Sequence, residues 1–203
     1  MRIQALVAFS LFLLVSQSPA YEKPMDLYKQ GQVALKKGDK ARARKHFVES
    51  CRLDTDGACV EAGKLSTSKE FLAELETACK AGENADCLML AFAKLKSGQK
   101  TAAKNGMIEL CHRPMYANSE LACTTAIGLI KIPGDVKNLL EEAEECEHWL
   151  GEEGSTDARR KEIEKGVEQA CGKQEESVVK LRVKYKGEPD IQFILARVED
   201  EDR

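Results

Sequence analysis

The spacing of the cysteines constrains this chain more than any other feature of its sequence. Two stretches share the pattern Cys-x7-Cys, Cys51 to Cys59 and Cys79 to Cys87. A third stretch, from Cys111, is a longer version of the same pattern. Each stretch follows one amphipathic segment and opens another, so the sequence indicates a tandem array of helix-turn-helix repeats.

Apolar and small residues recur at helical spacing within these units. In the first unit, Leu27 and Gly31 share one face of a helix, and Ala43 and Phe47 share one face of the next. Such a pair of helices cannot bury its apolar face alone, so neighbouring units must stack on one another. We therefore expect an all-α chain in which residues 21–150 form a right-handed α-solenoid.

The first twenty residues have the features of a secretory signal peptide. Arg2 supplies a positive charge, residues 3–15 are almost entirely apolar, and residues 18–20 are small enough for a signal peptidase. We interpret residues 1–20 as a cleaved signal peptide and expect a periplasmic or secreted protein without stable membrane insertion. The alternative is a retained anchor, for which the apolar run is short.

Export decides how the eight cysteines are interpreted. An even number of cysteines in an oxidising compartment indicates disulfides, although eight cysteines by themselves allow about 105 pairings. Structural zinc is the alternative, but the chain has no Cys-x-x-Cys, and His46, His112 and His148 are scattered singly. We expect four disulfides, no metal and no cofactor.

The charge of the chain argues against one class of partner. The chain has thirty-one Lys and Arg residues and thirty-four Asp and Glu residues, so its net charge is −3. No basic block is long enough to coat a phosphate backbone. We therefore expect no nucleic-acid binding.

The first unit is similar to a tetratricopeptide repeat, and the cysteine-bearing units resemble Sel1-like repeats. The residues that fall at tetratricopeptide spacings are Leu27, Gly31, Gly38, Ala43, Phe47 and Ser50. The Sel1-like resemblance is to the cysteine-rich kind found in secreted bacterial proteins, and it covers roughly residues 25–150. The chain departs from the pattern in its second unit, which lacks the glycine between helices, and in its fourth, where Asn138 replaces a small residue.

The resemblance also implies which cysteines pair. In such repeats a cysteine late in one unit bridges to a cysteine early in the next, and the two cysteines that remain here are left to each other. The four resulting pairs are Cys51 with Cys59, Cys79 with Cys87, Cys111 with Cys123, and Cys146 with Cys171.

The C-terminal segment has a different pattern. Residues 151–176 contain a glycine-bearing loop and a charged helix, which we expect to cap the solenoid. Residues 177–198 alternate apolar and charged side chains around a turn, which predicts a β-hairpin. Because an isolated hairpin is marginal in water, it should pack on the cap, dimerise or accept a strand. Residues 199–203 form an acidic, solvated tail.

The sequence offers little catalytic chemistry. Ser-x-x-Lys occurs at Ser66, Ser97 and Ser177, and some cysteine-rich Sel1-like proteins carry a β-lactamase label. A serine acylase also needs a second proton-relay motif, and neither Ser-Asp-Asn nor Lys-Thr-Gly is present. The four glutamates among residues 141–145 (Glu141, Glu142, Glu144 and Glu145) run around a helix and are interpreted as a solvated face. We therefore expect that this chain is not an enzyme.

A solenoid without catalytic motifs is expected to bind a protein or peptide. In tetratricopeptide-type arrays the first helix of each unit lines the concave face, and its outward positions here offer an apolar strip flanked by lysines. The positions so mapped are Tyr28, Gln32, Lys36, Val60, Lys64, Leu88, Phe92, Lys96, Thr124 and Lys131. The alternative is that Leu88 and Phe92 belong to the core and that the lysines are merely solvated.

The resulting functional hypothesis is a non-catalytic adaptor, chaperone-like subunit or inhibitor that binds a peptide or protein with an acidic group. Two alternatives stay open. One is a penicillin-binding or β-lactamase-like enzyme, and the other is a structural subunit that assembles through its C-terminal hairpin.

Overall fold

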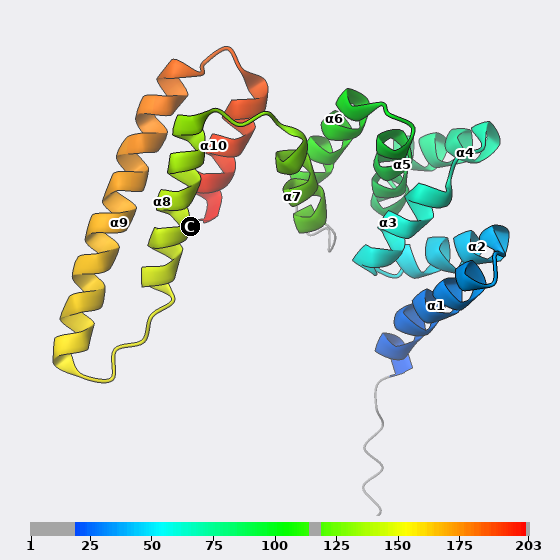
Figure 1. Cartoon of the computed structure of the whole chain (residues 1–203), viewed down its shortest axis with the longest axis horizontal. Coiled ribbons are helices and arrows are strands. Elements are labelled where there is room, and N and C mark those ends of the chain that lie inside the picture. Colours follow the sequence, from blue (N-terminus) through cyan, green and yellow to red (C-terminus); the bar gives the residue numbers. More distant parts are fainter. Residues whose placement is uncertain (1–18, 114–118, 202–203) are drawn as a thin grey trace, which may run out of the picture.

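The computed structural model describes residues 19–113 and 119–201, which form ten helices and no strand (Figure 1). The helices are α1 (Pro19–Lys36), α2 (Lys40–Cys51), α3 (Asp56–Leu65), α4 (Lys69–Lys80), α5 (Asn84–Lys96), α6 (Lys100–Cys111), α7 (Ser119–Leu129), α8 (Gly134–Leu150), α9 (Asp157–Lys184) and α10 (Pro189–Glu201). The expected all-α class is confirmed for this part of the chain.

Helices α1 to α7 stack in chain order, as a helical repeat solenoid requires. Helix α1 packs on α2, α2 on α3 and α3 on α5, while α5 also contacts α4 and α6, and α6 contacts α7. The predicted fourth unit departs from this scheme, because α8 packs along α9 rather than pairing with α7 (Figure 1). The described chain therefore consists of an α1–α7 array followed by a three-helix unit, α8–α10.

Left-handed residues end four of the helices. Gly38 and Gly98 have φ near +80° between paired helices, and Gly82 has φ +97° in its Cys-x7-Cys loop. In the preceding loop the same position, three residues after the first cysteine, is held by Asp54 at φ +63°. At each site the next N–H reaches back five residues to a helix carbonyl, as in the bond from Asp39 N to Ala34 O. The two Cys-x7-Cys loops therefore share a left-handed residue at the same position, which accounts for their identical spacing.

Small residues allow the helices of the array to approach closely. A Cβ on Gly31 would lie 2.6 Å from the Phe47 ring, and one on Gly63 would lie 2.5 Å from Phe92 Cβ and 2.7 Å from the Met89 carbonyl oxygen. Phe47 is fully buried between α1 and its neighbours. These two glycines fix how α1 meets α2 and how α3 meets α5.

All four implied disulfide pairs are present in the structure. They join Cys51 to Cys59, Cys79 to Cys87, Cys111 to Cys123, and Cys146 to Cys171. The first three bridge the end of one helix to the start of the next. The fourth links two antiparallel helices, α8 and α9.

The predicted β-hairpin over 177–198 is wrong. The first half of that segment continues α9, where Val178, Leu181 and Tyr185 share a buried face at helical spacing. The alternation depended on Val179 and Val183, which are 65% and 75% exposed. A period of 3.6 residues, rather than 2, therefore describes which side chains the fold buries.

The second half of the predicted hairpin forms α10. Its residues Ile191, Ile194, Leu195 and Val198 are all buried, and they recur at the three- and four-residue intervals of a helix. The Gln174 side-chain amide on α9 donates to the Val198 carbonyl oxygen at 3.5 Å. Helix α10 thus fills the space beside α8 and α9 (Figure 1).

The expected terminal segments also differ from the structure. The cap predicted over 151–176 is only the first part of α9, which runs for 28 residues. The acidic tail over 199–203 begins inside α10, where Glu199 pairs with Arg182 and is therefore not simply solvated. The predicted signal peptide lies outside the described residues, except for its last two positions, which begin α1. Within the described ranges, no helix is both long and apolar enough to cross a membrane.

Candidate functional site

The predicted concave-face residues are not all available to a ligand. Leu88 is fully buried and Phe92 is 7% exposed, so the apolar strip that they were expected to form is wrong. The physical reason is helix α3, whose Gly63 lies directly against Phe92 and the backbone of Met89. Both side chains belong to the core of the array.

The other predicted contact residues are spread along the array without forming one site. Tyr28 and Val60 are half-buried, and the ring centroid of Tyr28 lies 5.6 Å from that of Phe47. Lys64 pairs with Glu61 of its own helix at 2.9 Å. The exposed members of the set are Gln32, Lys36, Lys64, Lys96, Thr124 and Lys131.

The three Ser-x-x-Lys matches have ordinary helical environments. The buried hydroxyl of Ser66 donates to the Ala62 carbonyl oxygen one turn earlier, and the exposed hydroxyl of Ser97 donates to the Lys94 carbonyl oxygen. Ser177 lies within α9 rather than at the start of a strand. Across the described residues, no group of three or more His, Cys, Asp and Glu side chains is placed to hold a metal ion.

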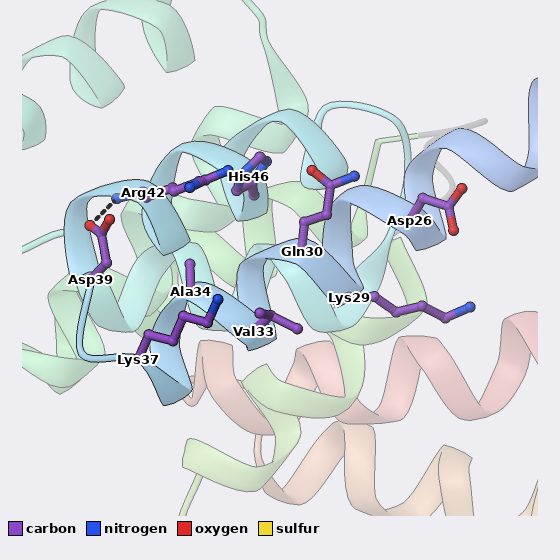
Figure 2. Close-up of a pocket in the computed structure, with 9 residues that line it drawn as sticks. All are labelled: Asp26, Lys29, Gln30, Val33, Ala34, Lys37, Asp39, Arg42 and His46. Carbon is purple, nitrogen blue, oxygen red and sulfur yellow. Dashed lines mark hydrogen bonds between the residues drawn. The ribbon is translucent and has the colours of Figure 1, made fainter.

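A partly apolar groove lies between α1 and α2 (Figure 2). Its volume is about 320 Å³. Val33 and Ala34 form its apolar part, and Val33 is 52% exposed. The polar residues that line it are Asp26, Lys29, Gln30, Lys37, Asp39, Arg42 and His46.

The local sequence explains why basic groups surround this groove. Asp39 caps α2 by accepting a hydrogen bond from the Arg42 backbone N–H at 3.0 Å, which starts the helix where the turn ends. The first turn of α2 then presents Arg42 to the groove, and the last turn of α1 brings Lys37 to the same edge (Figure 2). Lys29, Lys37 and Arg42 form no ion pair with any described residue. Their charges are therefore available to a ligand.

The third repeat shows why the groove is open. Residues of α5 and α6 lie sixty positions after their counterparts in α1 and α2, as Gly98 follows Gly38. The counterpart of Val33 is Ala93, only 3% exposed beneath α3, and the counterpart of Lys29 is the fully buried Met89. No described helix covers the same face of α1. The groove is thus the unoccupied version of a helix-binding surface that the array uses internally.

Charge is unevenly distributed along the chain. Residues 19–52 carry nine Lys and Arg against four Asp and Glu, a net charge of +5, whereas residues 134–201 carry eleven against nineteen, a net charge of −8. The overall charge of −3 conceals this contrast.

No family model, curated protein or solved structure matches this chain. The site must therefore be interpreted from its own geometry.

Sequence reasoning missed this groove, although part of its signal was present. A count of charges by segment would have found the basic first unit, and Lys29 and Val33 replace the apolar and small residues found sixty positions later. The openness of the groove depends on the absence of a neighbouring described helix, which no local pattern reports.

Proposed function

We propose that this chain is an exported, disulfide-linked, right-handed α-solenoid of the Sel1-like kind that acts as a non-catalytic binding module for a protein or peptide. The partner presents an acidic, partly apolar segment to the groove between α1 and α2. The observation that carries the proposal is the open groove with Val33 at its surface and unpaired basic side chains at its edges.

The chemistry of the groove selects this class of partner. An apolar side chain of the partner can cover Val33 and Ala34, which removes apolar surface from water. Carboxylates beside that side chain can pair with Lys37 and Arg42, and arginine in particular binds a carboxylate through two parallel hydrogen bonds. An amphipathic helix or an extended segment with this pattern fits a surface that elsewhere in the array receives a helix.

Export of the chain is supported by its cysteines. Four disulfides account for all eight cysteines, and disulfides persist in oxidising compartments. A periplasmic or extracellular site of action follows from this argument, together with the apolar N-terminal segment.

Peptide selection tests the proposal. A phage-displayed library of random twelve-residue peptides is selected against the immobilised chain, and one enriched peptide is then titrated by fluorescence anisotropy. We expect enriched peptides to combine Asp or Glu with an apolar residue. The Lys37→Glu, Arg42→Glu double variant should bind at least about tenfold more weakly at low salt, mainly through slower association.

A matched variant controls for net charge. Lys161→Glu, Lys173→Glu makes the same change in charge on exposed positions of α9, away from the groove, and should leave binding unchanged. Enrichment of peptides without acidic residues, or equal losses in the two double variants, would contradict the proposed site.

A further inference from the structure

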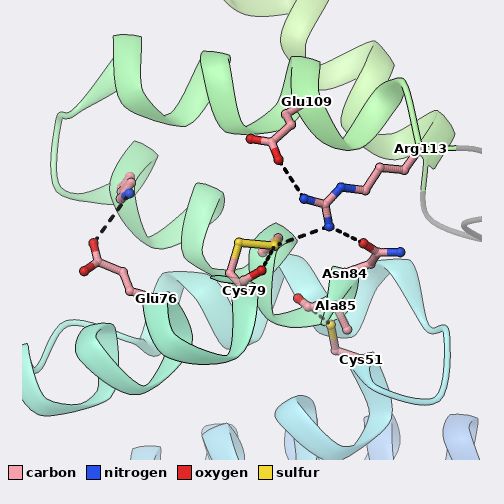
Figure 3. The surroundings of a disulfide bond; sticks show 9 residues. Cys51, Glu76, Cys79, Asn84, Ala85, Glu109 and Arg113 are labelled. Atoms are coloured by element: carbon pink, nitrogen blue, oxygen red, sulfur yellow. Dashed lines mark hydrogen bonds and ion pairs between the residues drawn. A yellow bond between two sulfur atoms is a disulfide. The ribbon is translucent and has the colours of Figure 1, made fainter. Parts of the chain in front are cut away.

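The Cys79–Cys87 disulfide has a cation beside it. The Arg113 Nη1 atom lies 3.8 Å from Cys87 Sγ. Figure 3 shows Arg113 beside the disulfide that Cys79 forms. The same guanidinium donates to the Asn84 side-chain oxygen and pairs with the Glu109 carboxylate at 2.7 Å. These contacts hold the positive charge in place against one sulfur of the pair.

A cavity gives access to this disulfide. It has a volume of about 260 Å³ and lies between α5 and α6, with both Cys79 and Cys87 in its wall. Cys79 is half-buried, whereas Cys87 is 5% exposed. The Cys51–Cys59 pair offers a contrast, because both of its cysteines are completely enclosed. An incoming group can therefore reach Cys79 more readily than Cys87 or either cysteine of that pair.

The two sulfurs differ in how well they can leave. A thiolate breaks a disulfide by attacking one sulfur, and the electron pair of the broken bond goes to the other, whose departure is faster when its thiolate is stabilised. Arg113 and the first turn of α5 both place positive potential at Cys87. The neighbouring Asp86 carboxylate opposes them less than its position suggests, because it is paired with Arg52 at 2.7 Å.

We propose that the Cys79–Cys87 disulfide is a thiol-exchange site, at which a small thiol forms a mixed disulfide with Cys79 while Arg113 stabilises the thiolate of Cys87. One sulfur–sulfur bond breaks and one forms, and one thiolate is consumed as another is released. The step therefore needs no oxidant beyond the disulfide itself. The inference is independent of the α1–α2 groove.

Opening this bond has a local structural consequence. Helix α4 contributes one fully buried residue, Leu75, while Phe71 and Leu72 pack against the core partly buried, and it also makes contacts with charged side chains of other helices. They include the stacking of Arg44 over Phe71 at 4.6 Å and the Glu76–Lys94 ion pair at 3.6 Å. Exchange at Cys79 should therefore loosen α4 and leave the rest of the array intact.

Graded reduction of the full chain tests the proposal. The oxidised protein is incubated with reduced glutathione or, separately, with uncharged 2-mercaptoethanol, quenched in acid, alkylated and mapped by mass spectrometry. We expect both thiols to attach first to Cys79 with Cys87 free, while Cys51–Cys59 stays closed. Amide exchange should rise in residues 69–80 at the same stage. First opening of another pair, or attachment at Cys87, would overturn the assignment.

Variants near Cys87 distinguish stabilisation of its thiolate by Arg113 from a general loosening of the surrounding helices. Arg113→Gln should slow opening by about three- to tenfold, because Cys87 becomes a poorer leaving group. Glu109→Gln, which removes the carboxylate that competes for the guanidinium, should speed it. Lys100→Gln removes an exposed cation at the start of α6, away from both sulfurs, and as the control should leave the rate with 2-mercaptoethanol unchanged. Faster opening in Arg113→Gln would show that Arg113 only braces the fold.

Discussion

Disulfides in the α1–α7 array bridge short turns, with sequence separations of 8, 8 and 12 residues, whereas the one disulfide of the α8–α10 unit spans 25 residues. The two regions also bury different side chains. The array buries small side chains, such as Ala43 and Ala62, together with large ones, such as Phe47 and Leu88, whereas the consecutive residues Phe193, Ile194 and Leu195 of α10 are all large and buried. Small residues bring helices close but remove little apolar area from water. Three of the six connections between consecutive helices of the array, α2–α3, α4–α5 and α6–α7, add a covalent link to this packing.

Polar contacts also stabilise the α8–α10 unit. The Asp135 carboxylate at the start of α8 accepts hydrogen bonds from Lys184 at 2.5 Å and from the Tyr185 hydroxyl at 2.8 Å. These contacts fasten the beginning of α8 to the end of α9. The long helices α8 and α9 are thus linked at their ends, whereas the short helices of the array are linked by a disulfide at every second connection.

Removal of a disulfide should have the largest effect on the free energy of unfolding. This effect should differ between the two regions. In the loop-entropy account, Cys146→Ala, Cys171→Ala lowers the free energy of unfolding by about 3.5 kcal/mol, against about 2.5 kcal/mol for Cys79→Ala, Cys87→Ala. Urea unfolding followed by far-UV circular dichroism measures the loss in each variant. Trp149 is the only tryptophan and lies on α8, so its fluorescence reports on the C-terminal unit alone. A larger loss for the short loop would contradict the entropic comparison.

A substitution at a closely packed helix contact of the array should have the next largest effect on the free energy of unfolding. Gly63→Ala places a methyl group against Phe92 and the Met89 backbone, neither of which can move freely, and should cost about 2 kcal/mol. Gly128→Ala on α7 is the matched control, because a Cβ there meets no atom within 4 Å. That control should stabilise the protein by about 0.5 to 1 kcal/mol. Equal effects of the two substitutions in thermal unfolding would show that the α3–α5 contact is not tight.

The smallest predicted effect concerns pH and the α8–α9 tie. Hydrogen bonds from Lys184 and Tyr185 hold the pKa of Asp135 below its usual value. Its contribution to stability is therefore complete above the unfolded-state pKa of about 3.9 and is lost as pH falls through the lower folded-state pKa. Asp135→Asn should be less stable than the parent at pH 7, and the difference should disappear in strong acid. Unfolding of both proteins is measured by Trp149 fluorescence. A difference in stability between them that persists unchanged below pH 2 would contradict this assignment.

The array was predictable where local chemistry determines it. The Cys-x7-Cys loops need a left-handed residue three positions after the first cysteine, and Gly82 and Asp54 are among the residue types that tolerate that conformation. Helix boundaries at Gly38 and Gly98 follow from the same cause. The pairing of the cysteines then agrees with the Sel1-like resemblance.

The errors arose where tertiary packing decides. Residues 177–185 contain both an alternating pattern and a helical one, and only packing against α8 and α10 selects the helical face of Val178, Leu181 and Tyr185. Likewise, the burial of Phe92 depends on Gly63 in another helix, so a face mapped by analogy with tetratricopeptide arrays placed it outside. The structural-subunit alternative relied on the hairpin and loses that support.

The separation of charge described for the first and last helices makes this molecule an electric dipole. With a net charge of +5 over residues 19–52 and −8 over residues 134–201, an approaching negative surface exerts a torque as well as a force. The chain should rotate as it approaches, so that α1 and α2 arrive first (Figure 1). At 0.1 M salt the field decays over about 10 Å, so this alignment acts only in the last step of an encounter. At lower ionic strength it extends further, and the fraction of collisions that begin with the correct end should rise.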